Sequence, residues 1–141
     1  MSAADFIDSN IFVYLFDTAD PRKQARAQTL ISGALATGSA CISFQVIQET
    51  LHVLTRKFAR PVATETAKDI LRDTLLPFLR VQSSPALYLR ALDVQERYRF
   101  SFYDSLIIAA ALEAGCTRLL SEDMQHGQRI ENLSIENPFR E

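Results

Sequence analysis

Four acidic residues spread along the chain could together hold a divalent cation: Asp8, Glu49, Asp104 and Asp123. Carboxylate oxygens are the ligands that Mg²⁺ and Mn²⁺ prefer, and crowded carboxylates repel one another unless a cation neutralises them. A divalent ion held in this way can activate a water molecule for attack on a phosphodiester bond. If the fold gathers the four side chains, they predict hydrolysis of a nucleic acid.

Each of these acids also has a local explanation. Asp8 could cap the helix that follows it, Asp104 could complement a helix dipole, and Asp123 could stabilise a turn. The hypothesis of a single site therefore depends on the elements that position the acids.

Those elements alternate between short apolar runs and longer amphipathic stretches. Strands are predicted at residues 6–8, 41–44, 78–81, 117–121 and 133–135, with a polar loop at residues 122–128. Helices are predicted at residues 11–16, from Pro21 to just before Gly38, and at residues 45–56, 64–76, 85–98 and 105–114. Asp20, Ser43 and Ser84 stand where helix N-caps are expected.

Two of the predicted helices carry specific burial expectations. In the helix after Ser84, one face is expected to hold Tyr88, Ala91, Leu92, Gln95 and Tyr98. The helix at residues 105–114 is almost wholly apolar, so it is predicted to be buried on most sides, with Gly115 as its stop.

Alternating strands and helices predict an α/β fold, with a mainly parallel central sheet flanked by helices on both faces. Ligands of such sheets bind at the carboxyl ends of the strands. Asp8 and Asp123 are expected at strand ends, and Glu49 and Asp104 in or near the starts of helices. All four could therefore face one crevice.

Composition predicts one soluble domain over residues 1–141, with 48% hydrophobic and 23% charged residues. The uncharged run at residues 33–48 is interrupted by Gly38 and polar residues, so no membrane span is expected. The first residues lack the basic start of a secretory signal, which favours a cytoplasmic location. Cys41 and Cys116 are expected to be buried thiols.

Charge does not decide whether a nucleic acid is the substrate. The net charge is -2, and the basic clusters Arg22, Lys23, Arg26 and Arg56, Lys57, Arg60 are more often solvated helix faces than binding sites.

Four motifs together make the chain similar to a known family. They are Phe6-Ile7-Asp8-Ser9-Asn10, Gln48-Glu49, Phe102-Tyr103-Asp104-Ser105-Leu106-Ile107 and Leu120-Ser121-Glu122-Asp123, and the closing Asn137-Pro138-Phe139 adds to them. In order and rough spacing the chain resembles PIN-domain ribonucleases, in particular the VapC-like toxins of VapBC toxin-antitoxin pairs. The likeness extends over nearly the whole chain.

The resemblance implies a single PIN-like domain that cleaves RNA with Mg²⁺ or Mn²⁺, forms a homodimer and binds an antitoxin. It implies that Asp8, Glu49, Asp104 and Asp123 are the catalytic, metal-binding acids, with Asn10 and Ser121 as their polar companions. In the last motif Glu122 directly precedes Asp123, and either acid could reach the pocket; Asp123 is favoured. Ser121 replaces the more frequent threonine but keeps its hydroxyl.

Three other functions compete with this one. Glu49 and His52 have the Glu-x-x-His spacing of di-iron bundles, but one copy is insufficient. Asp8-Ser9-Asn10 faintly resembles a phosphatase motif of the haloacid-dehalogenase type, yet Asn10 cannot act as its general acid. A metal-binding module without catalysis, similar to a receiver domain, is the remaining alternative. His126 is expected to be a plain loop residue, and Phe100, Phe102 and Tyr103 are expected in the core rather than as base-stacking platforms.

Overall fold

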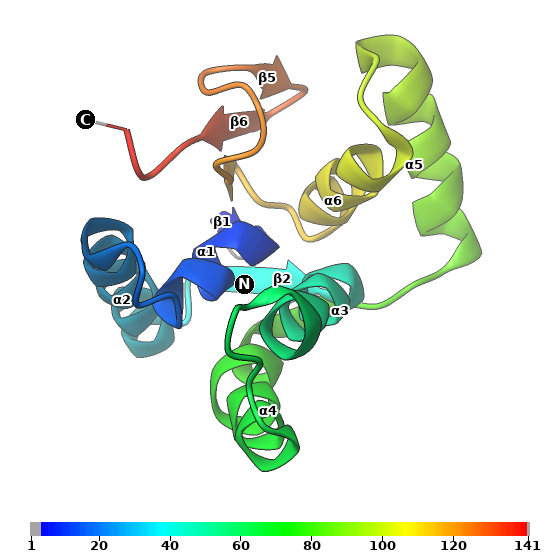
Figure 1. Cartoon of the computed structure of the whole chain (residues 1–141). Coiled ribbons are helices and arrows are strands. Elements are labelled where there is room, and N and C mark those ends of the chain that lie inside the picture. Colours follow the sequence, from blue (N-terminus) through cyan, green and yellow to red (C-terminus); the bar gives the residue numbers. More distant parts are fainter. Residues whose placement is uncertain (1–3, 141) are drawn as a thin grey trace.

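Six strands form one sheet in the order β3-β2-β1-β4-β6-β5 (Figure 1). The structure is a computed structural model that describes residues 4–140. The strands are β1 (Asp5–Ile7), β2 (Ala40–Ser43), β3 (Leu79–Val81), β4 (Arg118–Leu120), β5 (Arg129–Ile130) and β6 (Leu133–Glu136). All neighbouring strands pair in parallel except β5 and β6. The prediction of a mainly parallel sheet is confirmed, whereas β5 was not predicted because its two residues lie in a polar segment.

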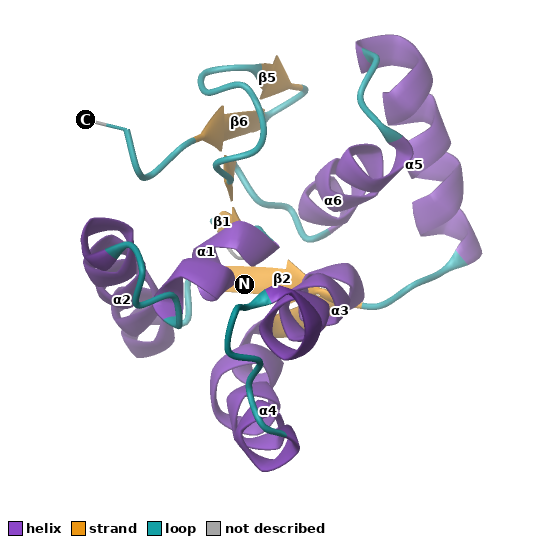
Figure 2. Ribbon diagram, viewed as in Figure 1, coloured by secondary structure: helices purple, strands orange, loops and turns teal. Residues whose placement is uncertain are grey.

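Helices cover both faces of this sheet, as predicted. They are α1 (Ser9–Leu15), α2 (Pro21–Thr37), α3 (Phe44–His52), α4 (Thr64–Ile70), α5 (Pro85–Tyr98) and α6 (Phe102–Glu113). In Figure 2, α2 lies on one side of the strands, while α5 and α6 lie on the opposite side. Helices α3 and α4 continue as the π-helical turns Val53–Lys57 and Leu71–Leu75, and the 3₁₀ turn Leu76–Phe78 leads into β3.

Helix caps follow the sequence signals at two of the three expected positions. The Asp20 carboxylate accepts a hydrogen bond from Lys23 N at 3.2 Å, and Ser84 Oγ accepts one from Leu87 N at 3.1 Å. Ser43 is the N-cap residue of α3, but its hydroxyl makes no cap hydrogen bond. The helix begins one residue earlier than predicted, at Phe44.

Packing around α6 makes that helix part of the core. Seven consecutive residues, 105–111, are buried, which confirms the predicted burial on most sides. The helix starts at Phe102, so Asp104 lies within its first turn rather than before it. Ser101 caps this start: its hydroxyl accepts a hydrogen bond from Asp104 N at 3.1 Å. Asp104 is therefore rigidly placed at the edge of the core.

The expected buried face of α5 was wrong in part. Leu87, Ala91 and Val94 are the buried residues, whereas Tyr88 and Leu92 are 40% and 50% exposed. Ala91 belongs to both the predicted and the observed face. The observed face, which packs against α6, is rotated about the helix axis so that it includes Leu87 and Val94.

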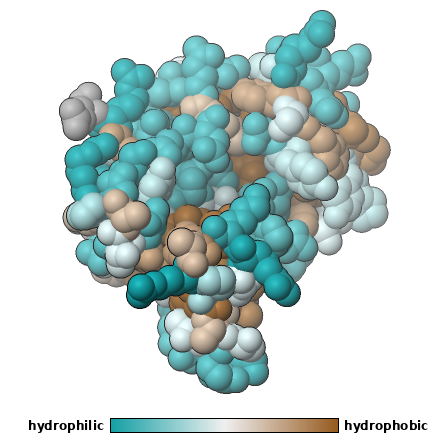
Figure 3. Space-filling model, in the orientation of Figure 1, coloured by the Kyte–Doolittle hydropathy of each residue, from teal (hydrophilic) through white to brown (hydrophobic). Residues whose placement is uncertain are grey.

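The face of the molecule in Figure 3 is mainly hydrophilic, with smaller hydrophobic patches between polar regions. Among residues 4–140, no helix combines the length and apolar character that a membrane crossing requires.

Candidate functional site

Asp8 lies at the centre of the candidate site. It follows β1, and its backbone N donates to Leu120 O at 3.0 Å, which ties it to the end of β4. The side chain is only 4% exposed. One carboxylate oxygen, Oδ1, accepts a hydrogen bond from Ser9 N at 2.8 Å, and so Asp8 also caps α1. The local capping role and a place in the acidic set are thus compatible.

Asn10 and Ser121 connect Asp8 to Asp123. Ser121 Oγ donates to Asp8 Oδ2 at 2.7 Å and accepts a hydrogen bond from Asp123 N at 3.2 Å. The Asn10 side-chain amide donates to Asp123 Oδ2 at 3.1 Å and lies 3.4 Å from Asp8 Oδ2. These two polar residues therefore orient both carboxylates from opposite ends of the chain.

Glu49 reaches the same group from α3. Ser9 Oγ donates to Glu49 Oε1 at 3.2 Å, and Gln45 Nε2 lies 3.3 Å from Glu49 Oε2. The same Gln45 amide donates to Tyr103 O at 3.1 Å, one residue before Asp104. Gln45 was missed in the sequence, where its signal was a polar residue one helical turn before Glu49.

Burial and mutual repulsion perturb the two inner acids. Burial is the main cause that raises the pKa of Asp8 from 3.8 to about 7, opposed by the hydrogen bonds from Ser121 and Ser9. The charges of Glu49 and Asp123 raise it further. Partial burial likewise raises the pKa of Asp104, and the charge of Asp123 adds to this effect. Asp8 therefore lies within electrostatic reach of Glu49 and Asp123, and Asp104 within reach of Asp123.

The acids do not form a closed metal cluster on their own. Within residues 4–140, no three His, Cys, Asp or Glu side chains are close enough together to hold a metal ion as they stand. Asp123 is exposed and Glu49 and Asp104 are half-buried, so the set opens outward from Asp8 to the surface.

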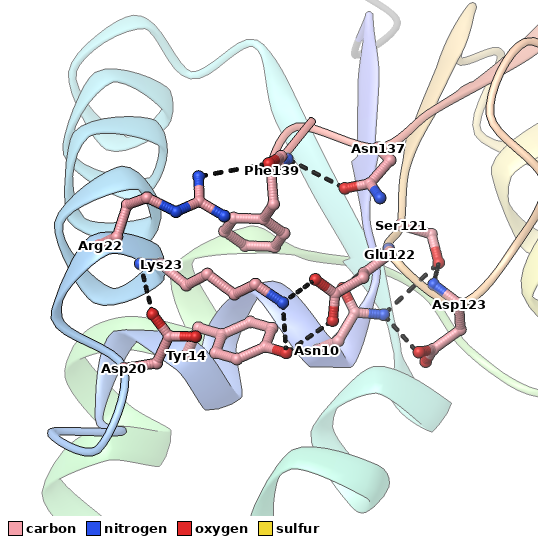
Figure 4. Close-up of polar contacts among 10 residues, drawn as sticks. All are labelled: Asn10, Tyr14, Asp20, Arg22, Lys23, Ser121, Glu122, Asp123, Asn137 and Phe139. Carbon is pink, nitrogen blue, oxygen red and sulfur yellow. Dashed lines mark hydrogen bonds and ion pairs between the residues drawn. The ribbon is translucent and has the colours of Figure 1, made fainter. Parts of the chain in front are cut away.

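Glu122 points away from this group, although it neighbours Asp123 in sequence (Figure 4). Its carboxylate accepts a hydrogen bond from Tyr14 Oη at 2.6 Å and pairs with Lys23 Nζ. The Lys23 ammonium also lies 4.8 Å from the centre of the Tyr14 ring. The backbone N of Glu122 donates to Asn10 Oδ1 at 3.2 Å. The loop therefore turns one acid toward α2 and the other toward Asp8.

The first basic cluster of the sequence has a structural role. Arg22 and Arg26 donate to the carbonyl oxygens of Phe139 and Pro138 at 3.3 and 3.1 Å. The Phe139 ring in turn packs edge-on against Tyr14, with ring centres 4.9 Å apart. The closing segment is thus fastened to α2 and supports the Lys23 and Tyr14 side chains that hold Glu122. In contrast, Arg56, Lys57 and Arg60 are exposed.

The histidines, the cysteines and the aromatic residues around the start of α6 lie outside the acidic set. His52 is exposed at the end of α3, and His126 Nδ1 accepts a hydrogen bond from Asn137 N at 3.0 Å. Cys41 and Cys116 are buried as predicted, with their sulfur atoms 3.6 Å apart. Phe100 and Phe102 pack against the core, but the prediction for Tyr103 was wrong, because its side chain is 66% exposed.

Comparison with known proteins identifies the fold. The chain matches the PIN domain family over residues 6–129. A toxin-antitoxin complex from Klebsiella pneumoniae has 18% identity and a TM-score of 0.67, covering 95% of this chain and 97% of that chain. VapC20 of Mycobacterium tuberculosis, a toxin that cleaves the sarcin-ricin loop, has 22% identity and a TM-score of 0.61, covering 84% and 89%. VapBC2 from Rickettsia felis, solved with a fragment of its promoter DNA, has 18% identity and a TM-score of 0.66, covering 94% and 97%.

No curated protein matches the chain. The chain belongs to the PIN-domain family, since the family match spans most of its length. This confirms the resemblance drawn from the four acidic motifs, and the solved toxins share the fold over nearly their full lengths.

Proposed function

We propose that this protein is a metal-dependent endoribonuclease and the toxin of a toxin-antitoxin pair. One observation carries the proposal: Asp8 is buried at the end of β1, and the charges of Glu49 and Asp123 act on it. Burial of a carboxylate among other carboxylates is costly, so such an arrangement needs a compensating cation or proton. Membership of the PIN-domain family and the likeness to solved toxins, one of which cleaves the sarcin-ricin loop, support the same function.

The donor set fits Mg²⁺ or Mn²⁺. The side chains of Asp8, Asp123 and Ser121, which are joined through hydrogen bonds with Asn10 and with each other, offer oxygen atoms as metal ligands, and so do the carboxylates of Glu49 and Asp104. Mg²⁺ retains several waters and takes only one or two protein carboxylates directly, so a closed cluster of three acids is not required. Soft donors are absent from this group, which disfavours zinc.

We assign Asp8 and Asp104 to the principal ion, Glu49 to positioning the attacking water, and Asp123 to a contact through water. Asn10 and Ser121 fix the carboxylates of Asp8 and Asp123 by the hydrogen bonds described above. The ion would lower the pKa of water and stabilise negative charge on the phosphate. Ser9 and Gln45 hold the two oxygens of Glu49 in a fixed orientation.

The partners follow from the similar structures. Two of them are described as complexes with an antitoxin or of a VapBC pair, which supports an antitoxin partner here. A homodimer is proposed as well, and the exposed residues Tyr88, Leu89 and Leu92 on α5 offer an apolar surface for it. A cytoplasmic location remains a prediction from the sequence.

Cleavage of a mixed RNA pool tests the activity directly. Wild-type protein should cut RNA with Mg²⁺ or Mn²⁺ and not with chelator. Asp104→Asn should be slower by at least about a hundredfold, because the amide keeps the side chain's shape but loses its charge. Sequencing the new RNA ends would identify the cut sites. Protein that binds the metal but leaves RNA uncut in every condition would favour the metal-binding module without catalysis. A covalent phosphoaspartate on the protein would favour a phosphatase of the haloacid-dehalogenase type.

Calorimetric titration with Mn²⁺ separates the roles of the two neighbouring acids. Asp123→Asn should weaken binding by about tenfold, the effect expected of a group that contacts the ion through water. Glu122→Gln should change it by less than about threefold, because Glu122 is paired with Lys23 and Tyr14 instead. The opposite ranking would assign the site to Glu122.

A further inference from the structure

A single buried amide joins the two helices that carry Glu49 and Asp104. Gln45 is only 3% exposed. Its Nε2 lies 3.3 Å from Glu49 Oε2, one turn further along α3, and 3.1 Å from the backbone oxygen of Tyr103 in the first turn of α6. Glu49 Oε2 and the Tyr103 carbonyl oxygen can only accept hydrogen bonds, so the NH₂ end of the Gln45 amide must face them. One NH₂ group therefore links the Glu49 carboxylate to the backbone of the residue that precedes Asp104.

The other end of the amide argues against a purely stabilising role. Gln45 Oε1 is buried and has no hydrogen-bond partner within the described chain. An unsatisfied buried acceptor costs about 1–3 kcal/mol, and replacing such a group with an apolar one of similar shape can be neutral or better. A methionine or leucine would fill this space without that cost. The benefit of glutamine must therefore come from its two donor contacts.

We propose that Gln45 is a positioning residue that sets the separation of the Glu49 and Asp104 carboxylates. Gln45 donates to one carboxylate oxygen of Glu49, and Ser9 Oγ donates to the other, Oε1, at 3.2 Å. Gln45 also fixes the carbonyl of Tyr103, which directly precedes Asp104, and so fixes the start of α6 relative to α3. This inference rests on the proposed function, in which the two acids serve one metal ion.

Thr50 provides a matched control on the same helix. It is fully buried, and its Oγ1, like Gln45 Oε1, has no hydrogen-bond partner among the residues that the structure describes. Thr50→Val removes that hydroxyl with little change of shape. Gln45→Met, with Gln45→Leu as a second variant, removes the amide at similar volume. Comparing the variants separates loss of a buried polar group from loss of contact with Glu49 and Tyr103.

The test is Mn²⁺ titration by calorimetry, with urea unfolding and RNA cleavage measured on the same samples. Gln45→Met should bind Mn²⁺ about tenfold to a hundredfold more weakly, the range seen when outer contacts of metal ligands are lost. Its kcat should fall while KM stays near the wild-type value, since the substrate surface is unchanged. The urea midpoint should shift little. Thr50→Val should match wild type in Mn²⁺ binding and RNA cleavage, and its urea midpoint should stay the same or rise, because it loses an unsatisfied buried hydroxyl.

Three outcomes would contradict the inference, and they are distinguishable. Wild-type binding and cleavage in the Gln45→Met and Gln45→Leu proteins would overturn the positioning role alone. A large drop in the urea midpoint with unchanged Mn²⁺ affinity would make Gln45 a structural tie instead. Wild-type protein that neither binds Mn²⁺ nor cuts RNA would overturn the proposed function, and the role of Gln45 with it.

Discussion

Replacing Asp8 with asparagine is expected to raise the free energy of unfolding of the metal-free protein by about 3 kcal/mol near pH 8. The pKa of Asp8 is raised by burial from 3.8 to about 7 in the folded protein, a shift worth roughly 4 kcal/mol. Asparagine removes this charge but puts an NH₂ group where Asp8 Oδ2 accepts hydrogen bonds from Ser121 and Asn10. The Ser121 hydroxyl can turn to accept from the new NH₂ group, whereas losing the Asn10 contact offsets about 1 kcal/mol.

The raised pKa of Asp8 also predicts how the free energy of unfolding changes with pH. Between about pH 4 and about pH 7, folded wild-type protein keeps an Asp8 proton that the unfolded chain has released. Its free energy of unfolding should therefore fall as pH rises through this window, whereas that of Asp8→Asn should fall much less. Urea unfolding in chelator across this range measures both. Asp93→Asn, at an exposed position on α5, is the matched control. Parallel curves for wild type and Asp8→Asn would contradict the prediction.

The same substitution should abolish RNA cleavage. We expect a loss of about a thousandfold or more in the single-turnover rate with saturating Mg²⁺, comparable to removing a central catalytic group. Asp8 is the most buried of the four acids, so neither water nor a neighbouring side chain can replace its charge. If Asp8→Asn is more stable than wild type but inactive, the Asp8 carboxylate serves catalysis at a cost in stability and is not needed for folding.

Single-turnover cleavage of a short RNA containing a mapped cut site measures this loss. Asp93→Asn should cut at the wild-type rate, because its carboxylate is exposed on α5, a helix that carries none of the four acids. Activity of Asp8→Asn within tenfold of wild type would remove Asp8 from the catalytic group.

The sequence predicted the alternation of elements and the convergence of the acids because both depend on local signals. Apolar runs, caps and proline positions marked most strands and helices, and the parallel order that these imply places their carboxyl ends together. The charges of Glu49 and Asp123 act on Asp8, and that of Asp123 acts on Asp104, while the role of the four acids as one metal site stays a prediction. Asn10 and Ser121 also make the hydrogen bonds expected of polar companions.

Other features could not be predicted, because they depend on side-chain direction across long sequence separations. Whether Glu122 or Asp123 faces Asp8 is decided by Lys23 and Tyr14, which lie on different helices. The link from Gln45 to Tyr103 joins residues 58 positions apart. The rotation of α5 that buries Val94 rather than Leu92 follows from packing on α6, which helical periodicity alone does not fix.

The place of β1 in the sheet has a consequence for how the protein is made. Asn10 and Asp123 are 113 residues apart in sequence, yet they share a hydrogen bond, and Asp8 depends on Leu120 and Ser121 for its backbone and side-chain contacts. During synthesis the N-terminal part emerges first and cannot assemble these contacts until the β4 segment has left the ribosome. Chains that have not yet grown past Asp123 therefore lack the assembled acidic group, and any activity that depends on this group must wait until that segment has been made.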